Sequence, residues 1–244
     1  MSITINEHLT EALKKLGIAN LRLQQEAPME AILNNEDVIV LMPTSGGKSL
    51  LYQLPAVMEP GNLTLVISPL KALQLDQVDA LRSKGIRAAV LNSDLSAAEH
   101  SSVLEDMTRR GGLLYLAPEQ LQNMAVADAL RTANLTRIAV DEAHTLPQAK
   151  DDFRKAYGKV GSFIHSLPHR PQVIALTATA TRNDVSRIRK SLGIPNADRV
   201  VARLEPLAQP LDELDGRAVD DDGAMLVPLA QLPLDGLEEH IFGR

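Results

Sequence analysis

The chain has 244 residues, 45% of them hydrophobic, which suffices for the core of one large domain or of one ordinary domain with an appendage. It contains no cysteine, which excludes disulfide bonds, thiolate metal sites and thiol nucleophiles and leaves oxygen and imidazole as metal ligands. No stretch reaches the roughly 18 consecutive apolar residues of a membrane-spanning helix, and the N-terminus lacks the pattern of a signal peptide, so we expect a cytoplasmic protein without a membrane partner.

The formal net charge of −6 is unevenly distributed. Residues 201–244 contain three basic and ten acidic residues, a net charge of −7, whereas residues 1–200 carry +1. A nearly neutral body does not by itself indicate a polyanionic partner, so a nucleic-acid contact would need a local basic face. The prolines and charge of residues 201–244 favour a solvated or loosely docked tail. The alternative is an acidic segment that docks on a partner or mimics DNA.

Two helices are expected before the first strand. Asn6 is the predicted N-cap of the first helix, because apolar residues at positions 9, 12, 13 and 16 share one helical face and Gly17 follows them. A second helix is predicted for residues 24–33, with Pro28 in its first turn, where the missing N–H group costs little.

From residue 38 onward, short apolar runs alternate with segments long enough for crossover helices. The runs are bounded by turn residues, as is typical of strands that are buried on both faces. We predict strands at 38–42, 63–67, 88–91, 113–117, 138–140 and 173–176, and helices at 70–84, 96–110, 119–131 and 182–192. The alternation indicates an α/β fold with a parallel sheet and helices on both faces, whose ligands bind at the carboxyl ends of the strands.

A phosphate-binding loop is predicted directly after the first strand. It consists of Thr44, Ser45, Gly46, Gly47, Lys48 and Ser49, and a helical run at 50–56 follows it. The glycines allow the backbone to wrap a phosphate, Lys48 supplies a positive charge, and Ser49 can bind Mg²⁺. The complete pattern has glycine at position 42, where this chain has Met42. The alternative is a glycine-rich turn with a chance Lys-Ser pair.

An acidic pair follows the predicted strand 138–140 and should reach the same edge of the sheet. We expect Asp141 to hold Mg²⁺ and Glu142 to polarise the water that attacks the γ-phosphate. The alternative is a helix N-terminus whose dipole favours acidic residues. Further along, the hydroxyls of Thr177 and Thr179 follow strand 173–176 and could sense the γ-phosphate through His144, although such residues are also ordinary N-caps.

Taken together, these motifs resemble the first motor domain of superfamily 2 helicases. The motifs of that domain have counterparts here in the same order and at approximately the same spacing. These segments are MPTSGGKSLLYQLPA, VISPLKALQLDQV, LYLAPEQL, AVDEAH, DFR and ALTATAT. The amino-acid sequences of these motifs resemble those of the RecQ family of ATP-dependent DNA helicases, whose phosphate loop also has methionine at the position of Met42. The similarity covers roughly residues 5–200 and implies a RecA-like P-loop NTPase fold, ATP and Mg²⁺ as cofactors, and single-stranded or forked DNA as partner.

The resemblance also implies roles for the nucleotide-site residues. Lys48 and Ser49 would bind the ATP phosphates and Mg²⁺, together with Asp141 and Glu142 as the Mg²⁺-binding and water-activating pair. His144, Thr177 and Thr179 would link hydrolysis to movement on DNA. Gln25 would read the adenine edge with Arg22 nearby, unless Gln25 is only a glutamine on a core helix.

For DNA, the resemblance implies a sequence-independent backbone contact by Ser68, Pro69 and Lys71. The alternative is a plain connection between a strand and a helix. Phe153 and Arg154 match the remainder of an aromatic-rich loop that senses single strands in this family.

Three departures from the family pattern bear on activity. Ala149 and Asp151 replace the tryptophan and histidine of the aromatic-rich loop, which should weaken DNA stimulation of ATP hydrolysis because base stacking contributes on the order of 1–3 kcal/mol per aromatic. Ile18 and Leu21 replace aromatic residues near the adenine motif, so nucleotide affinity should be low. Nothing after residue 200 resembles the second motor domain with its arginine finger, which can contribute about 10³–10⁵ in rate.

The leading interpretation is therefore the ATP-binding motor half of a RecQ-type DNA helicase, a domain at 1–200 followed by an acidic tail at 201–244. By itself it should hydrolyse ATP slowly and unwind nothing, because 3′–5′ movement needs a second motor domain. One rival is a nucleotide-gated regulatory module that docks on a helicase partner. Another is a degenerate remnant without enzymatic activity.

Overall fold

The computed structural model describes residues 2–148, 159–195 and 197. The chain divides into two compact units, Met1–Leu204 and Glu205–Arg244, and every described residue lies in the first. The predicted acidic tail thus lies outside the described residues, and the predicted boundary near residue 200 stays a prediction. Within the described ranges, no helix is long and apolar enough to cross a membrane.

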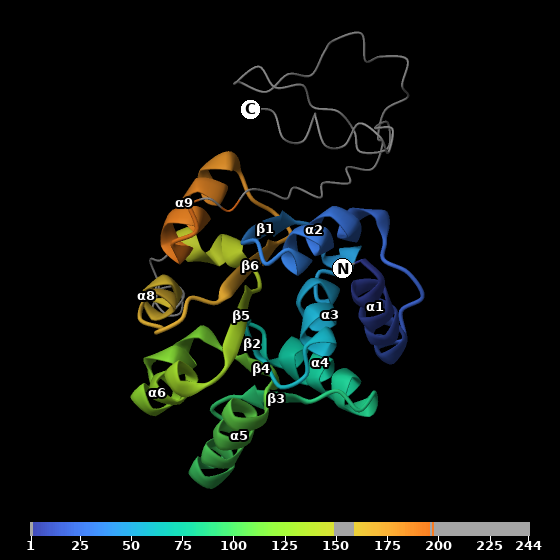
Figure 1. Cartoon of the computed structure of the whole chain (residues 1–244). Helices are drawn as coiled ribbons and strands as arrows, with labels where there is room; N and C mark the ends of the chain where they lie inside the picture. The colour runs from blue at the N-terminus through green and yellow to red at the C-terminus, as the bar shows by residue number, and fades with distance from the viewer. Residues whose placement is uncertain (1, 149–158, 196, 198–244) are drawn as a thin grey trace, which may run out of the picture. The chain divides into compact units, whose positions relative to one another are not determined.

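A six-stranded parallel sheet forms the centre of this unit, in the order β1-β6-β5-β2-β4-β3 (Figure 1). Its strands are β1 Val38–Leu41, β2 Leu63–Ile67, β3 Ala88–Leu91, β4 Gly112–Leu116, β5 Leu135–Val140 and β6 Gln172–Thr177. Their apolar runs are almost entirely buried, because helices cover both faces. The predicted α/β fold with helices on both faces is confirmed.

The helices divide between the two faces of the sheet (Figure 1). One face is covered by α1 Ser2–Leu16, α2 Leu23–Leu33, α3 Leu50–Met58 and α4 Lys71–Ser83. The other is covered by α5 Ala97–Arg110, α6 Met124–Thr132, α8 Val160–His165 and α9 Arg182–Leu192. Among the described residues, three short 3₁₀ segments lie between these elements, namely η1 Thr44–Gly46, η2 Pro118–Gln122 and η3 Ala143–Gln148.

Three local predictions require correction. Pro28 does not lie in the first turn of the second helix, because α2 begins at Leu23 and Pro28 lies inside it. The first helix begins at Ser2, so Asn6 lies inside it and is not its N-cap. The helix predicted at 119–131 is divided into η2 and α6, because the side chain of Asn123 accepts a hydrogen bond from the N–H of Ala125 at 3.0 Å and starts a new helix there.

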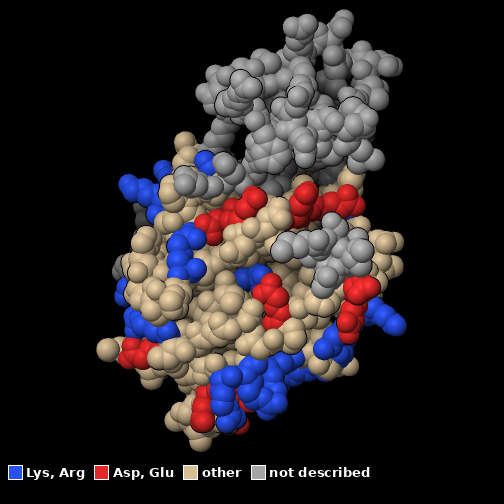
Figure 2. Space-filling view, viewed as in Figure 1, with Lys and Arg blue, Asp and Glu red and all other residues tan. Residues whose placement is uncertain are grey.

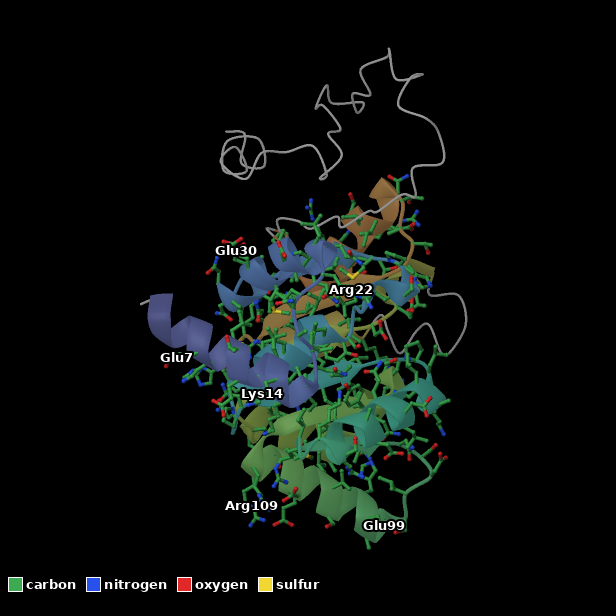
Figure 3. The ribbon with its side chains drawn as sticks, turned by 90° about the vertical axis from the view of Figure 1, so that its right-hand side faces the viewer. Glu7, Lys14, Arg22, Glu30, Glu99 and Arg109 are labelled. Atoms are coloured by element: carbon green, nitrogen blue, oxygen red, sulfur yellow. The ribbon has the colours of Figure 1, made fainter. Side chains whose placement is uncertain are left out.

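Charged residues at helix ends complement the helix dipoles. Figure 3 shows Glu99 and Arg109 on α5, where they lie in the first and last turns.

In Figure 2, lysine and arginine side chains gather at the lower edge of the molecule, over α5 and β3 of Figure 1. Part of this positive charge is neutralised, because Arg87 and Arg110 both pair with Asp106, at 2.6 and 3.4 Å.

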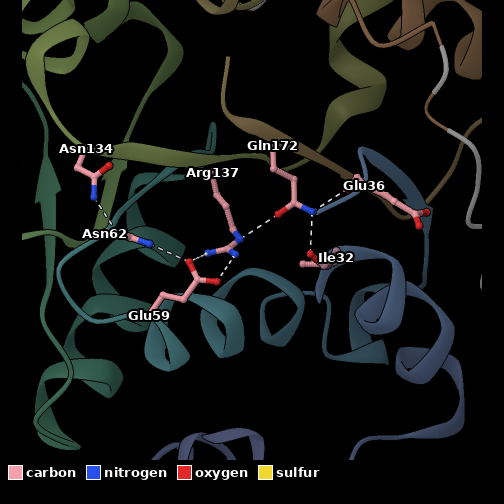
Figure 4. Close-up of polar contacts among 7 residues, drawn as sticks. All are labelled: Ile32, Glu36, Glu59, Asn62, Asn134, Arg137 and Gln172. Atoms are coloured by element: carbon pink, nitrogen blue, oxygen red, sulfur yellow. Dashed lines mark hydrogen bonds and ion pairs between the residues drawn. The ribbon is translucent and has the colours of Figure 1, made fainter. Parts of the chain in front are cut away.

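A partly buried polar network connects elements at the edge of the sheet at which the strands begin (Figure 4). The guanidinium of Arg137 on β5 donates to both carboxylate oxygens of Glu59, at 2.9 and 2.6 Å, and to Gln172 on β6 at 2.9 Å. Gln172 in turn donates to the carbonyl oxygens of Ile32 and Glu36, at 2.9 and 2.7 Å. Burial raises the pKa of Glu59, but the bonds from Arg137 outweigh it and hold that pKa below its usual value. The network ties α2 and α3 to the central strands and leaves the opposite edge for a ligand.

Candidate nucleotide-binding site

The phosphate loop connects β1 to α3 at the carboxyl edge of the sheet. Thr44, Ser45 and Gly46 form η1, and Gly47 adopts the left-handed conformation with φ of 77°, which glycine takes without strain. The Lys48 side chain is buried and Ser49, half-buried, directly precedes α3. The side chain of Thr44 lies outside the described part of the structure.

Met42, the departure from the usual pattern, forms the floor of this loop. Its side chain is 1% exposed. A Cβ atom on Gly46 would lie 2.4 Å from Cγ and 2.8 Å from Sδ of Met42. The space that a glycine at position 42 would leave open is therefore filled by Met42, and any larger residue at position 46 would require the buried Met42 side chain to move.

This packing predicts that Gly46→Ala lowers the affinity for Mg-ATP by about tenfold or more, since overpacking of 1–3 kcal/mol would displace the loop. Adding Met42→Ala to the same chain removes Cγ and Sδ and should restore most of the affinity. The measurement is the Kd of a fluorescent ATP analogue for both single variants and the double variant. A double variant that binds no better than Gly46→Ala contradicts the prediction.

The predicted adenine motif lies against the phosphate loop. Gln25, 3% exposed, donates from Nε2 to the carbonyl oxygens of Gly46 and Gly47, both at 3.1 Å, and its Oε1 accepts from the Arg22 N–H at 2.9 Å. The guanidinium of Arg22, at the start of α2 (Figure 3), donates to the carbonyl oxygen of Ser45 at 2.6 Å. Both amide hydrogens of Gln25 are thus engaged, so donation to an adenine nitrogen would require Gln25 to exchange one of these bonds, whereas Oε1 keeps a second lone pair that can accept from the adenine amino group.

The acidic pair lies opposite the loop, at the end of β5. Glu142 Oε1 is 3.6 Å from Lys48 Nζ, and Asp141 is buried with 6% exposed. Burial raises the pKa of Asp141, the charge of Glu142 raises it further, and Lys48 partly offsets both. Glu142 has a φ of 51°, a left-handed conformation that is uncommon for residues other than glycine and clusters at functional sites.

His144 and Thr177 join the acidic pair to β6. Nδ1 of His144 lies 3.3 Å from Glu142 Oε2 and 3.1 Å from Thr177 Oγ1. The hydroxyl of Thr177 donates to the carbonyl oxygen of Thr179 at 2.8 Å, so its oxygen is available as acceptor for His144. The predicted group of His144, Thr177 and Thr179 is thus brought together next to Glu142, with the hydroxyl of Thr177 beside the imidazole and the carbonyl oxygen of Thr179 bonded to that hydroxyl.

The predicted DNA-contact residues differ in exposure. Ser68 is buried, with 3% exposed, at the end of β2, so its side chain is not on the surface. Lys71, 47% exposed, begins α4 and donates to Ser93 Oγ at 2.8 Å and to Asp94 Oδ1 at 3.0 Å. The sequence reasoning did not identify Ser93 and Asp94, although they follow β3 and therefore reach the same edge of the sheet. Phe153, Arg154, Ala149 and Asp151 lie outside the described residues.

The residues at this edge fit Mg-ATP. The Nζ of Lys48 is buried and its charge is paired with Glu142 at 3.6 Å, but it has no hydrogen-bond acceptor among the described residues, so it can donate to an anionic ligand oxygen. Ser49 and Asp141 could hold Mg²⁺. The described ranges contain no group of three or more His, Asp or Glu side chains suited to a metal.

The family of the chain follows from a comparison with family models. The model for DEAD/DEAH box helicases matches residues 22–188. The chain belongs to this family. The match spans the phosphate loop, the acidic pair and the Thr177 loop, so it includes every described residue of the candidate nucleotide site and confirms the predicted helicase resemblance.

Known proteins similar to this DEAD/DEAH box chain include several RecQ-type helicases. It is 38% identical over 209 residues to the probable ATP-dependent DNA helicase RecS of Bacillus subtilis, which covers 82% of this chain and 42% of that protein. It is 36% identical to the ATP-dependent DNA helicase RecQ of Haemophilus influenzae, over 81% of this chain and 33% of that protein. The chain therefore spans less than half the length of these relatives.

Solved structures of helicases share the fold of this DEAD/DEAH box chain. The DUF1998 helicase MrfA bound to DNA has a TM-score of 0.63 at 23% identity, over 79% of this chain and 29% of that one. A hypothetical ATP-dependent RNA helicase from Sulfolobus tokodaii has a TM-score of 0.63 at 17% identity, over 80% of this chain and 57% of that one. At these identities the likeness concerns the fold, and it confirms the predicted RecA-like architecture.

Proposed function

We propose that this chain is the ATP-binding motor half of a RecQ-type ATP-dependent DNA helicase. The observation that carries the proposal is the meeting of Lys48 and Glu142, 3.6 Å apart, with Asp141 beside them at the carboxyl edge of the sheet. The relatives, which are named ATP-dependent DNA helicases, support DNA as the polymer on which the complete motor moves. The direction that we propose for this movement is 3′–5′. Unwinding is proposed only for an assembly that also contains a second motor domain. We further propose that the protein is cytoplasmic.

The residues of the site have distinct proposed tasks. Lys48 neutralises the β- and γ-phosphates, and backbone N–H groups of the loop bind their oxygens. Ser49 and Asp141 hold Mg²⁺, which supplies additional positive charge to the phosphates when bound. Glu142 accepts the proton of the attacking water, and Nδ1 of His144 holds the Glu142 carboxylate in place while bonded to Thr177. Lys71 contacts the DNA backbone in the proposed complex.

A second candidate function is a nucleotide-gated module that binds a partner without unwinding. Ala149 and Asp151, which stand where the family has aromatic-loop residues, favour it because they remove the stacking that couples DNA to hydrolysis. In this alternative, the site binds ATP but does not turn it over.

Binding and hydrolysis of radiolabelled ATP, with and without single-stranded DNA, test the proposal. We expect Mg²⁺-dependent binding, slow turnover, and loss of both in Lys48→Ala. Binding without turnover favours the second candidate. A wild-type chain that is folded but binds no nucleotide overturns both and leaves a degenerate remnant.

A further inference from the structure

Helix α4 connects the proposed DNA contact with the interior of the molecule. Lys71 is its first residue, and Gln74, Val78 and Leu81 are buried along its inner side. Gln74 donates from Nε2 to the carbonyl oxygen of Ser68 at 2.7 Å, at the end of β2, which pairs with β5 of the acidic pair. The first turns of α4 are thus tied to the strand next to Asp141.

A second glutamine of α4 is bonded to the helix of the phosphate loop. Gln77 Oε1 accepts the hydroxyl of Tyr52 at 2.7 Å, and Gln53 Nε2 lies 3.5 Å from the same oxygen. Tyr52 and Gln53 lie in the first turn of α3, directly after Lys48 and Ser49. One amide oxygen on α4 therefore meets two side chains from the element that carries the phosphate-binding residues.

The tyrosine in this contact is buried against a second tyrosine. Tyr52 and Tyr115 are each 1% exposed, and their rings meet edge to face at 70°, with centroids 6.2 Å apart. Burial raises the pKa of Tyr52 well above its usual value, and Tyr115 and the carboxylate of Asp141 raise it further. The hydroxyl is consequently protonated and acts as the donor to Gln77, while Gln53 Nε2 lies 3.3 Å from the hydroxyl of Tyr115.

Stability alone does not require this polar contact. An apolar pair of the same shape, phenylalanine against leucine, can be as stable as a buried hydrogen bond, because folding only exchanges bonds to water for bonds within the protein. What a hydrogen bond adds is a fixed direction and distance between the two helices.

We infer that Tyr52 and Gln77 are positioning residues that couple nucleotide binding at Lys48 and Ser49 to the DNA contact at Lys71. The inference rests on the proposed function and extends it. A phosphate that draws in the loop moves the start of α3, and the bond between Tyr52 and Gln77 transmits this movement to α4. Because coupling is reciprocal, DNA bound at Lys71 changes nucleotide affinity by the same factor.

The test measures this coupling as the ratio of two dissociation constants for DNA, one without nucleotide and one with nucleotide bound. The Kd of fluorescein-labelled oligo(dT) is determined for the full chain without nucleotide and with saturating Mg-AMPPNP. We expect a ratio of at least about fivefold in the wild type, falling below about twofold in Tyr52→Phe, in Gln77→Leu and in the double variant. The Kd of Mg-AMPPNP in the absence of DNA should stay within about twofold of the wild-type value in all three.

Tyr52→Phe keeps the ring and its packing, so it protects the test against a failure of the double variant to fold. The control is Asn134→Ala, which removes a 2.7 Å hydrogen bond to Asn62 at the opposite edge of the sheet and should leave the ratio unchanged (Figure 4). A wild-type ratio near one, or variants that keep the wild-type ratio, overturns the inference while the proposed function stands. A folded wild type that binds neither nucleotide nor DNA overturns both.

Discussion

Glu142→Gln is expected to slow ATP hydrolysis by about 10²–10⁴-fold, the usual contribution of a general base. The amide keeps the shape of the side chain but cannot accept the proton of the attacking water. Because Lys48 and the loop backbone are unchanged, Mg-ATP should still bind. The measurement is single-turnover hydrolysis of labelled ATP with the chain in excess, together with the Kd of Mg-ATP.

Glu119→Gln provides the matched control for this variant. Glu119 is a partly buried glutamate that follows β4 and so lies at the same edge of the sheet, but it makes no contact with Lys48 in the structure. Its substitution should leave hydrolysis within about twofold of the wild-type rate, which corresponds to less than about 0.5 kcal/mol. If Glu142→Gln hydrolyses ATP at the wild-type rate, the role assigned to Glu142 is wrong.

Gly161→Ala is expected to destabilise the domain by about 3 kcal/mol and to lower its Tm by about 6–12 °C. Gly161 lies on α8 where this helix packs against the end of α9, and a Cβ atom there would come within 1.7 Å of the carbonyl oxygen of Ser191. The obstacle is backbone, so no side-chain rotation can relieve the overlap, and the two helices must separate.

Thermal unfolding followed by circular dichroism measures this effect. The neighbouring Ser162→Ala is the control, because Ser162 is exposed on the same helix and its substitution should change Tm by about 2 °C or less. Equal midpoints for Gly161→Ala and the wild type would show that α8 and α9 do not pack as closely as the structure has them.

Local sequence patterns predicted the elements better than their ends. The six apolar runs correspond to the six strands, because a strand buried on both faces needs a continuous apolar segment wherever it lies in the sheet. The start of the first helix was misplaced at Asn6, since asparagine can also lie within a helix and helix ends are the least certain part of such a prediction. Helix α8 was not predicted, because its six residues are too few to show a helical period.

The sequence by itself determined that a phosphate loop and an acidic pair follow buried strands, because each is encoded by neighbouring residues. Only the tertiary structure decided that β1, β6 and β5 lie side by side, which brings Lys48 within 3.6 Å of Glu142, although 94 positions separate them in the numbering. It also decided that Gln25 bonds to the phosphate loop, that Lys71 meets Asp94, and that Tyr52 meets Gln77. These contacts depend on the order of strands and the packing of helices, which residue periodicity does not specify.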